Sequence, residues 1–277
     1  MSPPSSAADK IRVVATFTIL GDILQNVGRE HVVMTTLVGP NEDAHVYEPT
    51  PSDARALADA DLVFINGLGF EGWINRLIKA SGYKGQVVVA SEGIRPLKAE
   101  NGATDPHAWQ NLANGPVYVT NIAQALAAAD PKHSANYRQN AKDYNDKLTT
   151  QDRKIRRQFN TIPSDRRKVI TSHDAFQYFG RAYGIKFLAP VGLSTESEPS
   201  AGEVAALIRQ MRDESIRALF VENVTDPRLI QQLAREAGAV VGGTLYSDSL
   251  SDRIGPAATY INMFRHNTSK IVKALAN

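Results

Sequence analysis

Short apolar runs alternate with amphipathic segments along most of this chain. The runs are rich in β-branched residues, as buried strands are, and they fall at residues 11–17, 32–38, 61–66, 86–90, 168–172, 185–191, 218–221 and 240–245. Helical spacing of apolar residues follows at 19–27, 50–60, 71–80, 117–129, 175–183, 201–214, 227–237 and 255–276. Because a strand–helix–strand order places consecutive strands in parallel, the pattern predicts an α/β fold built on parallel sheets.

One segment in the middle of the chain has a different character. Residues 131–163 contain no glycine and no internal proline, and they are dense in Lys, Arg, Gln, Asn and Asp. Five apolar residues recur there at mostly helical intervals: Tyr137, Tyr144, Leu148, Ile155 and Phe159. A helix of this length would extend on the order of 40 Å, which is more than the width of a small domain. We therefore predict one long helix that joins two parts of the molecule.

The predicted long helix divides the chain into two halves of similar pattern. We expect a disordered leader at residues 1–10, an N-terminal α/β domain at 11–130, the linking helix at 131–163 and a C-terminal α/β domain at 164–277. The helix would act as a rigid strut between the two parallel-sheet domains. The alternative is a long solvated helix on the surface of a single domain.

Composition narrows the classes of function. With 277 residues, of which 43% are apolar, the chain is long enough for two domains with real cores. The net charge is +2, and acidic and basic residues are interleaved, so we expect no nucleic-acid partner. There is no cysteine, which excludes disulfides, thiolate metal sites and cysteine nucleophiles. Any metal must therefore be bound by histidines and carboxylates.

The first ten residues, MSPPSSAADK, are polar and carry no hydrophobic signal region. A mature exported protein whose signal was replaced by a starting methionine would look like this. A cytosolic protein would look the same, so the residues alone leave the compartment open.

Three of the six histidines stand where a strand or turn gives way to a loop or helix: His45, His107 and His173. Asp248 occupies the same kind of position after the last strand-like run. Ligands of parallel α/β sheets gather outside the carboxyl ends of the strands, so these four residues are candidates for one shared crevice. The other three histidines lie in polar contexts, and we assign them no ligand role: His31, His133 and His266.

Three imidazoles and one carboxylate would suit Zn²⁺ best among the common metals, whereas Mn²⁺ would prefer more oxygen ligands. If all four positions come from the protein, none is left for an activated water, and binding and release would be the whole function. The competing class is a zinc hydrolase with Glu222 or Asp248 as general base, which would require Asp248 not to bind the metal or a labile fifth position. No GxSxG motif supports a serine nucleophile.

A GxGxxG motif at residues 67–72 follows a predicted strand, with Glu92 twenty residues beyond Gly72. This matches the dinucleotide-binding fingerprint on paper. However, the motif follows the third predicted strand instead of the first, and Phe70 and Glu71 would lie where a pyrophosphate must approach. We therefore interpret it as a glycine-rich turn close to the cleft.

Five segments of the chain resemble a known family: VGPNEDAHVYEPTPSD, ADLVFINGLGFEGW, DPHAWQ, TSHDAFQYF and LYSDSLS. They are similar, in order and spacing, to segments of the metal-specific solute-binding proteins of bacterial zinc and manganese ABC importers, the ZnuA-like group (cluster A-I). The resemblance covers nearly the whole chain. It implies two α/β domains joined by one long helix, with the metal in the cleft between them.

The resemblance also implies roles for particular residues and partners. His45, His107, His173 and Asp248 match the four ligand positions, and histidine at the third position favours Zn(II) over Mn(II). The partners would be a divalent metal ion and the membrane permease of an ABC metal importer, and the protein would be a periplasmic monomer and not an enzyme. The His- and acid-rich loop that the best-known zinc members carry before the second ligand is missing, because residues 94–104 are short and contain no histidine. Some members act as surface adhesins, a role for which the chain shows no discriminating feature.

Four further carboxylates are near enough to the candidate ligands in sequence to orient their imidazoles: Asp43, Asp105, Asp174 and Glu222. Each of them could equally be a helix cap or a solvated loop charge. On metal loading we expect small domain movements, with the loops that carry His173 and Asp248 rearranging most.

Overall fold

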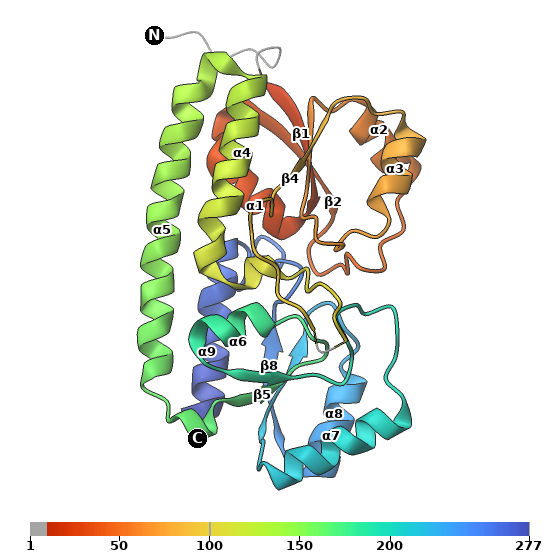
Figure 1. Ribbon diagram of the computed structural model, residues 1–277, viewed down its shortest axis with the longest axis vertical. Coiled ribbons are helices and arrows are strands. Elements are labelled where there is room, and N and C mark those ends of the chain that lie inside the picture. The colour runs from red at the N-terminus through yellow and green to blue at the C-terminus, as the bar shows by residue number, and fades with distance from the viewer. Residues whose placement is uncertain (1–9, 100, 277) are drawn as a thin grey trace.

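The computed structural model describes residues 10–99 and 101–276, so the predicted leader lies outside the described residues except for Lys10. Two four-stranded parallel sheets lie one above the other, and a single long helix runs beside both (Figure 1). The first sheet has the order β2-β1-β3-β4, and its strands are β1 (Ile11–Phe17), β2 (Val32–Val38), β3 (Leu62–Ile65) and β4 (Gln86–Val89). The second has the order β6-β5-β7-β8, and its strands are β5 (Lys168–Ile170), β6 (Lys186–Leu188), β7 (Ala218–Glu222) and β8 (Val240–Leu245).

Helices cover both faces of the first sheet, as the uninterrupted apolar character of its strands requires. In β1, every residue from Val13 to Phe17 is buried, and β1 pairs in parallel with β2 and β3. Helices α1 (Thr18–Gly28) and α4 (Gly115–Ala129) lie on the side facing the long helix, and α2 (Pro51–Ala58) and α3 (Ile74–Ser81) lie on the opposite side (Figure 1).

The second sheet repeats this arrangement. Helices α6 (Gln177–Tyr183) and α9 (Tyr260–Ala276) lie on the side of the long helix, and α7 (Ala201–Asp213) and α8 (Arg228–Ala237) cover the other side (Figure 1). The helix predicted at 255–276 begins at Tyr260, because residues 252–255 form a turn in which the Gly255 amide donates to the Asp252 carbonyl. Strands β5 and β6 end earlier than predicted, at Ile170 and Leu188, and an isolated parallel bridge joins His173 to Val191 beyond them.

The predicted long helix is α5 (Ser134–Asn160), 27 residues that extend about 40 Å. All five apolar residues predicted to define its inner face are buried. Polar residues of that face bind both halves of the molecule. Asn140 donates to the Val27 carbonyl at the end of α1, and Gln151 accepts a hydrogen bond from Arg265 of α9. The helix is therefore packed along both halves and does not cross open solvent between them.

One continuous apolar core runs from the first sheet, past α5, to the inner side of the second sheet. A second, smaller cluster lies between the second sheet and the pair α7 and α8, and includes Ile208, Leu219 and Leu233. Among the described residues, no helix has both the length and the apolar character needed to cross a membrane.

Replacing Leu148 on α5 by alanine should lower the free energy of unfolding by about 2–5 kcal/mol. Leu148 is fully buried and packs on Gly115 of α4, where an added Cβ would come within 2.7 Å of the leucine Cδ1. Urea unfolding followed by circular dichroism measures the change, and Lys154→Ala on the exposed face of α5 is the matched control. A Leu148→Ala protein as stable as that control would show that α5 is not a structural part of the core.

Candidate metal centre

The structure brings His45, His107, His173 and Asp248 together between the two sheets. One potential ligand atom from each of them lies within 4.8 Å of the others. His45 lies in the loop after β2, His107 in the segment between β4 and α4, His173 just beyond β5, and Asp248 just beyond β8. Each half of the molecule therefore supplies two residues, and all four come from segments outside the regular elements.

The Asp248 carboxylate is at the centre of this cluster. Its Oδ2 lies 3.0 Å from His173 Nε2 and 3.3 Å from His45 Nε2, and its Oδ1 lies 3.7 Å from His107 Nε2. The Nε2 atoms of His45 and His107 are 3.3 Å apart. His107, His173 and Asp248 are fully buried and His45 is 7% exposed, so the polar atoms converge at a point almost sealed from solvent. This group of three imidazole nitrogens and one carboxylate could hold a metal ion.

Carboxylates behind the imidazoles hold two of the rings. His107 Nδ1 is hydrogen-bonded to Asp105 Oδ1 at 2.8 Å, and His173 Nδ1 lies 2.8 Å from Glu222 Oε2. The same carboxyl groups also accept the backbone N–H of His107 and of His173, at 2.9 Å each. These contacts turn Nε2 of each ring toward the cluster, as the partners of metal-bound histidines commonly do.

The other two carboxylates considered from the sequence behave differently. Asp43 accepts the backbone N–H of His45 at 2.9 Å and therefore orients the chain at His45, but not its ring. Asp174 instead accepts a hydrogen bond from Gln177 at the start of α6. This is a local contact with the Gln177 side chain, and the N-cap position of α6 is Phe176, which has no side-chain cap.

The electrostatics of the cluster are those of a buried ion pair. Burial lowers the pKa of His173, but the carboxylates of Glu222 and Asp248 more than reverse this and hold it well above its ordinary value of 6.5. Burial would raise the pKa of Asp248, but the imidazoles of His173 and His107 hold it well below its usual range. This raised pKa favours the protonated form of His173, whose positive charge would lie beside Asp248.

Two tryptophans position ligand-bearing loops, and neither role was predicted from the sequence. Trp73 Nε1 donates to the carbonyl of Ala44, the residue before His45, at 2.8 Å. Trp109 Nε1 and Gln110 Nε2 donate to the carbonyl of Ser247, the residue before Asp248, at 2.9 and 2.6 Å. The sequence offered one clue to these roles, since the indole N–H of a buried tryptophan needs a hydrogen-bond acceptor. Which acceptor it finds depends on the fold, because Trp109 and Ser247 are 138 residues apart.

The GxGxxG segment is built around the buried carboxylate of Glu71. Glu71 accepts hydrogen bonds from the Thr16 hydroxyl and from the amides of Asn66 and Gly67. Burial raises the pKa of Glu71, and these three donors oppose that shift. Asn66 Nδ2 in turn donates to the carbonyl of Pro106, the residue before His107, at 3.0 Å. The amides that would face a pyrophosphate thus bind a carboxylate, and the loop positions His107 instead.

Comparison with known proteins gives one consistent result. A family model described as "Zinc-uptake complex component A periplasmic" matches residues 13–274. The manganese ABC transporter substrate-binding lipoprotein PsaA of Streptococcus mitis is 33% identical over 283 residues, covering 98% of this chain and 91% of the relative.

Solved structures of periplasmic metal-binding proteins agree with this family match. The periplasmic zinc-binding protein TroA of Treponema pallidum superposes with a TM-score of 0.92 at 32% identity, over 97% of this chain and all of that one. A manganese-bound periplasmic metal-binding protein of Candidatus Liberibacter asiaticus gives a TM-score of 0.87 at 32% identity, over 96% of this chain and all of that one. The two-domain α/β architecture predicted from the sequence is therefore confirmed.

In metal-free protein, Glu222→Gln should lower the pKa of His173, because it removes the negative charge beside Nδ1 while a side-chain oxygen remains to accept the His173 N–H. An NMR titration of the imidazole resonances measures this pKa, with half-buried His266, which lies outside the cluster, as the internal control. Wild-type His173 should still be protonated above pH 6.5, and His173 of the variant should lose its proton at a lower pH than in the wild type. An unchanged titration in a folded variant would mean that Glu222 does not set the charge of the ring.

Proposed function

Because the chain belongs to the zinc-uptake complex component A family of metal-binding, ABC-importer substrate-binding proteins, we propose that it captures Zn(II) with high affinity and delivers it to an importer. The observation that carries this proposal is the convergence of three imidazoles and one carboxylate within 4.8 Å of one another in a buried place. We assign His45, His107, His173 and Asp248 as the four ligands.

The donor set favours zinc over manganese. Three nitrogen ligands and one oxygen ligand, held tetrahedrally and shielded from water, suit Zn²⁺, whereas Mn²⁺ prefers more oxygen ligands and more coordination positions. Sites of this kind also bind Zn²⁺ more tightly than Mn²⁺ in the usual order of divalent affinities. Manganese is the alternative cargo, since PsaA of Streptococcus mitis is named as a manganese protein and TroA of Treponema pallidum as a zinc-binding one.

The family consists of substrate-binding proteins of transporters and not of enzymes, which removes the zinc-hydrolase alternative. Four protein ligands would fill a tetrahedral zinc site, so no bound water would be available for activation. The buried carboxylates Asp105 and Glu222 are accordingly positioned behind the histidine rings, where they would orient ligands.

We further propose the biological setting. The partner is the membrane permease of an ABC metal importer, and the protein works as a monomer in the periplasm. We propose domain boundaries at residues 11–130 and 164–277, with 131–163 as the link. The packing of α5 against α1 and α9 supports the view that the two domains move little when metal binds.

Native mass spectrometry tests the choice of metal. Chelator-stripped protein is equilibrated with zinc and manganese together and then challenged with a zinc chelator. One retained zinc per chain is the expected result. Retained manganese would make manganese the cargo, and no retained metal would contradict the four-ligand assignment.

His107→Ala should lower zinc affinity at least tenfold, because it removes one of four ligands from a site whose remaining donors cannot close around the ion. Competition with a chromophoric chelator measures the affinity. His31→Ala is the matched control, since His31 is stacked on His133 and lies outside the cluster. Equal affinities of the two folded variants would remove His107 from the site.

A further inference from the structure

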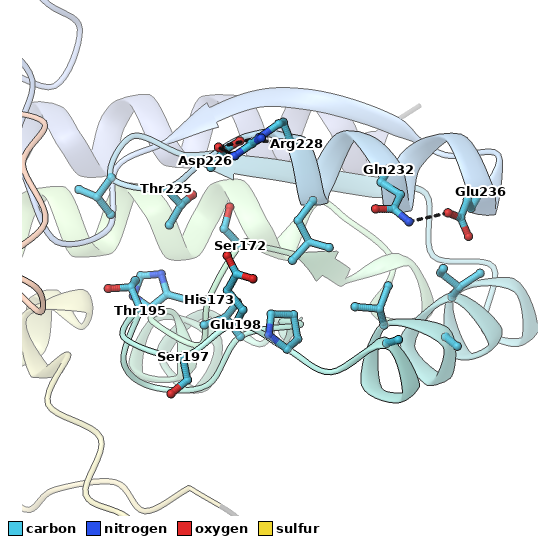
Figure 2. A pocket seen from close by; sticks show the side chains of 18 of the residues that line it. Ser172, His173, Thr195, Ser197, Glu198, Thr225, Asp226, Arg228, Gln232 and Glu236 are labelled. Atoms are coloured by element: carbon cyan, nitrogen blue, oxygen red, sulfur yellow. Dashed lines mark hydrogen bonds and ion pairs between the residues drawn. The ribbon is translucent and has the colours of Figure 1, made fainter.

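A cavity of about 820 Å³ opens beside the metal centre, in the second half of the molecule. It lies between α7 and α8 and is bordered by the loop that follows β6, residues 189–200. Figure 2 shows Gln232 and Glu236 of α8 at one end of the cavity and His173 at the other. The walls of the cavity belong mainly to α7, α8 and this loop.

The inner end of the cavity reaches one of the four proposed ligands, His173. Ser172 and His173, the residues just beyond β5, line it together with Asp43, which accepts the backbone N–H of His45. In the second sheet the chain goes from β5 to β6 on one side and then to β7 on the other. The crevice between the carboxyl ends of β5 and β7 is thus the switch point of the sheet, where α/β proteins admit ligands.

One side-chain hydrogen bond spans the inner end of the cavity. The Thr195 hydroxyl donates to Asp43 Oδ2 at 2.6 Å and so joins the loop after β6 to the loop after β2. Both side chains line the cavity. The other oxygen of the same carboxylate accepts the N–H of His45 at 2.9 Å, so the contact is directly connected to a proposed ligand residue.

The lining has the charge and size that suit a hydrated divalent cation. Four carboxylates line the cavity, those of Asp43, Glu198, Asp226 and Glu236, against the single guanidinium of Arg228. Such a negative surface attracts cations and raises their rate of arrival. An ion with six waters occupies roughly 180 Å³, taking about 30 Å³ for each water. The cavity therefore holds the ion without loss of its hydration shell.

We propose that this cavity is the access route by which the hydrated metal ion reaches and leaves the buried site, and that the Thr195–Asp43 hydrogen bond is its gate. The proposal rests on the proposed function, since it presumes that the four residues bind a metal. The ion would shed its water at the inner end, where His173 Nε2 would exchange its contact with Asp248 for contact with the metal, while Glu222 keeps its place beside Nδ1. The 7% exposed part of His45 is the competing route.

The first test weakens the gate. Thr195→Val removes the hydroxyl donor and keeps the shape of the side chain, so zinc association and dissociation should both become about tenfold faster, as expected for loss of a hydrogen bond to a charged group. A gate alters the barrier and not the end states, so Kd should stay within about threefold. Stopped-flow exchange with a chromophoric chelator gives both rates, and Thr161→Val at the end of α5 is the control.

The second test blocks the route after folding. Because the chain has no cysteine, Ala205→Cys on the cavity wall can be labelled selectively with a bulky aromatic maleimide. The label should slow zinc association and dissociation at least tenfold and leave Kd within about threefold. Labelled Arg153→Cys, on the exposed face of α5, should keep wild-type rates.

The outcomes separate this proposal from the function on which it rests. Unchanged rates in labelled Ala205→Cys, with tight zinc binding retained, would overturn the route and leave the binding function intact. A change of Kd in Thr195→Val without faster exchange would make Thr195 a positioning residue and would overturn its role as a gate. Absence of tight zinc binding in the unmodified protein would overturn the proposed function, and the access route with it.

Discussion

The placement of one carboxylate among three imidazoles is the constraint on which the rest of this structure depends. Asp248 has no exposed surface, and removing an unpaired carboxylate from water costs several kcal/mol. Protonated His173, the form that its raised pKa favours, would compensate that charge in the metal-free protein, and a bound metal would do so in the loaded protein. The four side chains of the cluster therefore favour a positive charge among them, and the residues that orient the imidazoles maintain this arrangement.

Such a site requires the two halves of the molecule to be fixed relative to each other, because each contributes two of the four residues. The apolar core continues from the first sheet through α5 to the second, and Asn140 and Gln151 add polar contacts at the two ends of the interface. Trp109 and Gln110 reach from the first half to the carbonyl before Asp248 in the second. Alignment of the halves and of the ligands is thus achieved by the same packing.

The order and type of the helices and strands were readable from the sequence because apolar periodicity reflects local geometry. The candidate ligands were also recognisable, since His45, His107, His173 and Asp248 all follow or precede elements whose ends meet at one edge. The residues that position these candidate ligands could not be recognised from the sequence. Glu71 looked like part of a glycine-rich motif, and no role was predicted for Trp73, because their hydrogen-bond partners, Thr16 and Ala44, are distant in sequence. Partners of this kind become visible only when the chain has folded.

The strand ends that differ from prediction show how the fold makes room for function. Strand β5 ends at Ile170, where the sequence turns polar, and Ser172 and His173 form hydrogen bonds with Glu222 at the end of β7. The layer of α7 and α8 beyond that point packs through a separate, smaller cluster instead of the continuous core. A layer with fewer apolar contacts opens at lower free energy than the core to which it is attached. The half that carries His173 and Asp248 is therefore divided into a fixed inner side, which aligns the ligands, and a softer outer side, where movement costs least.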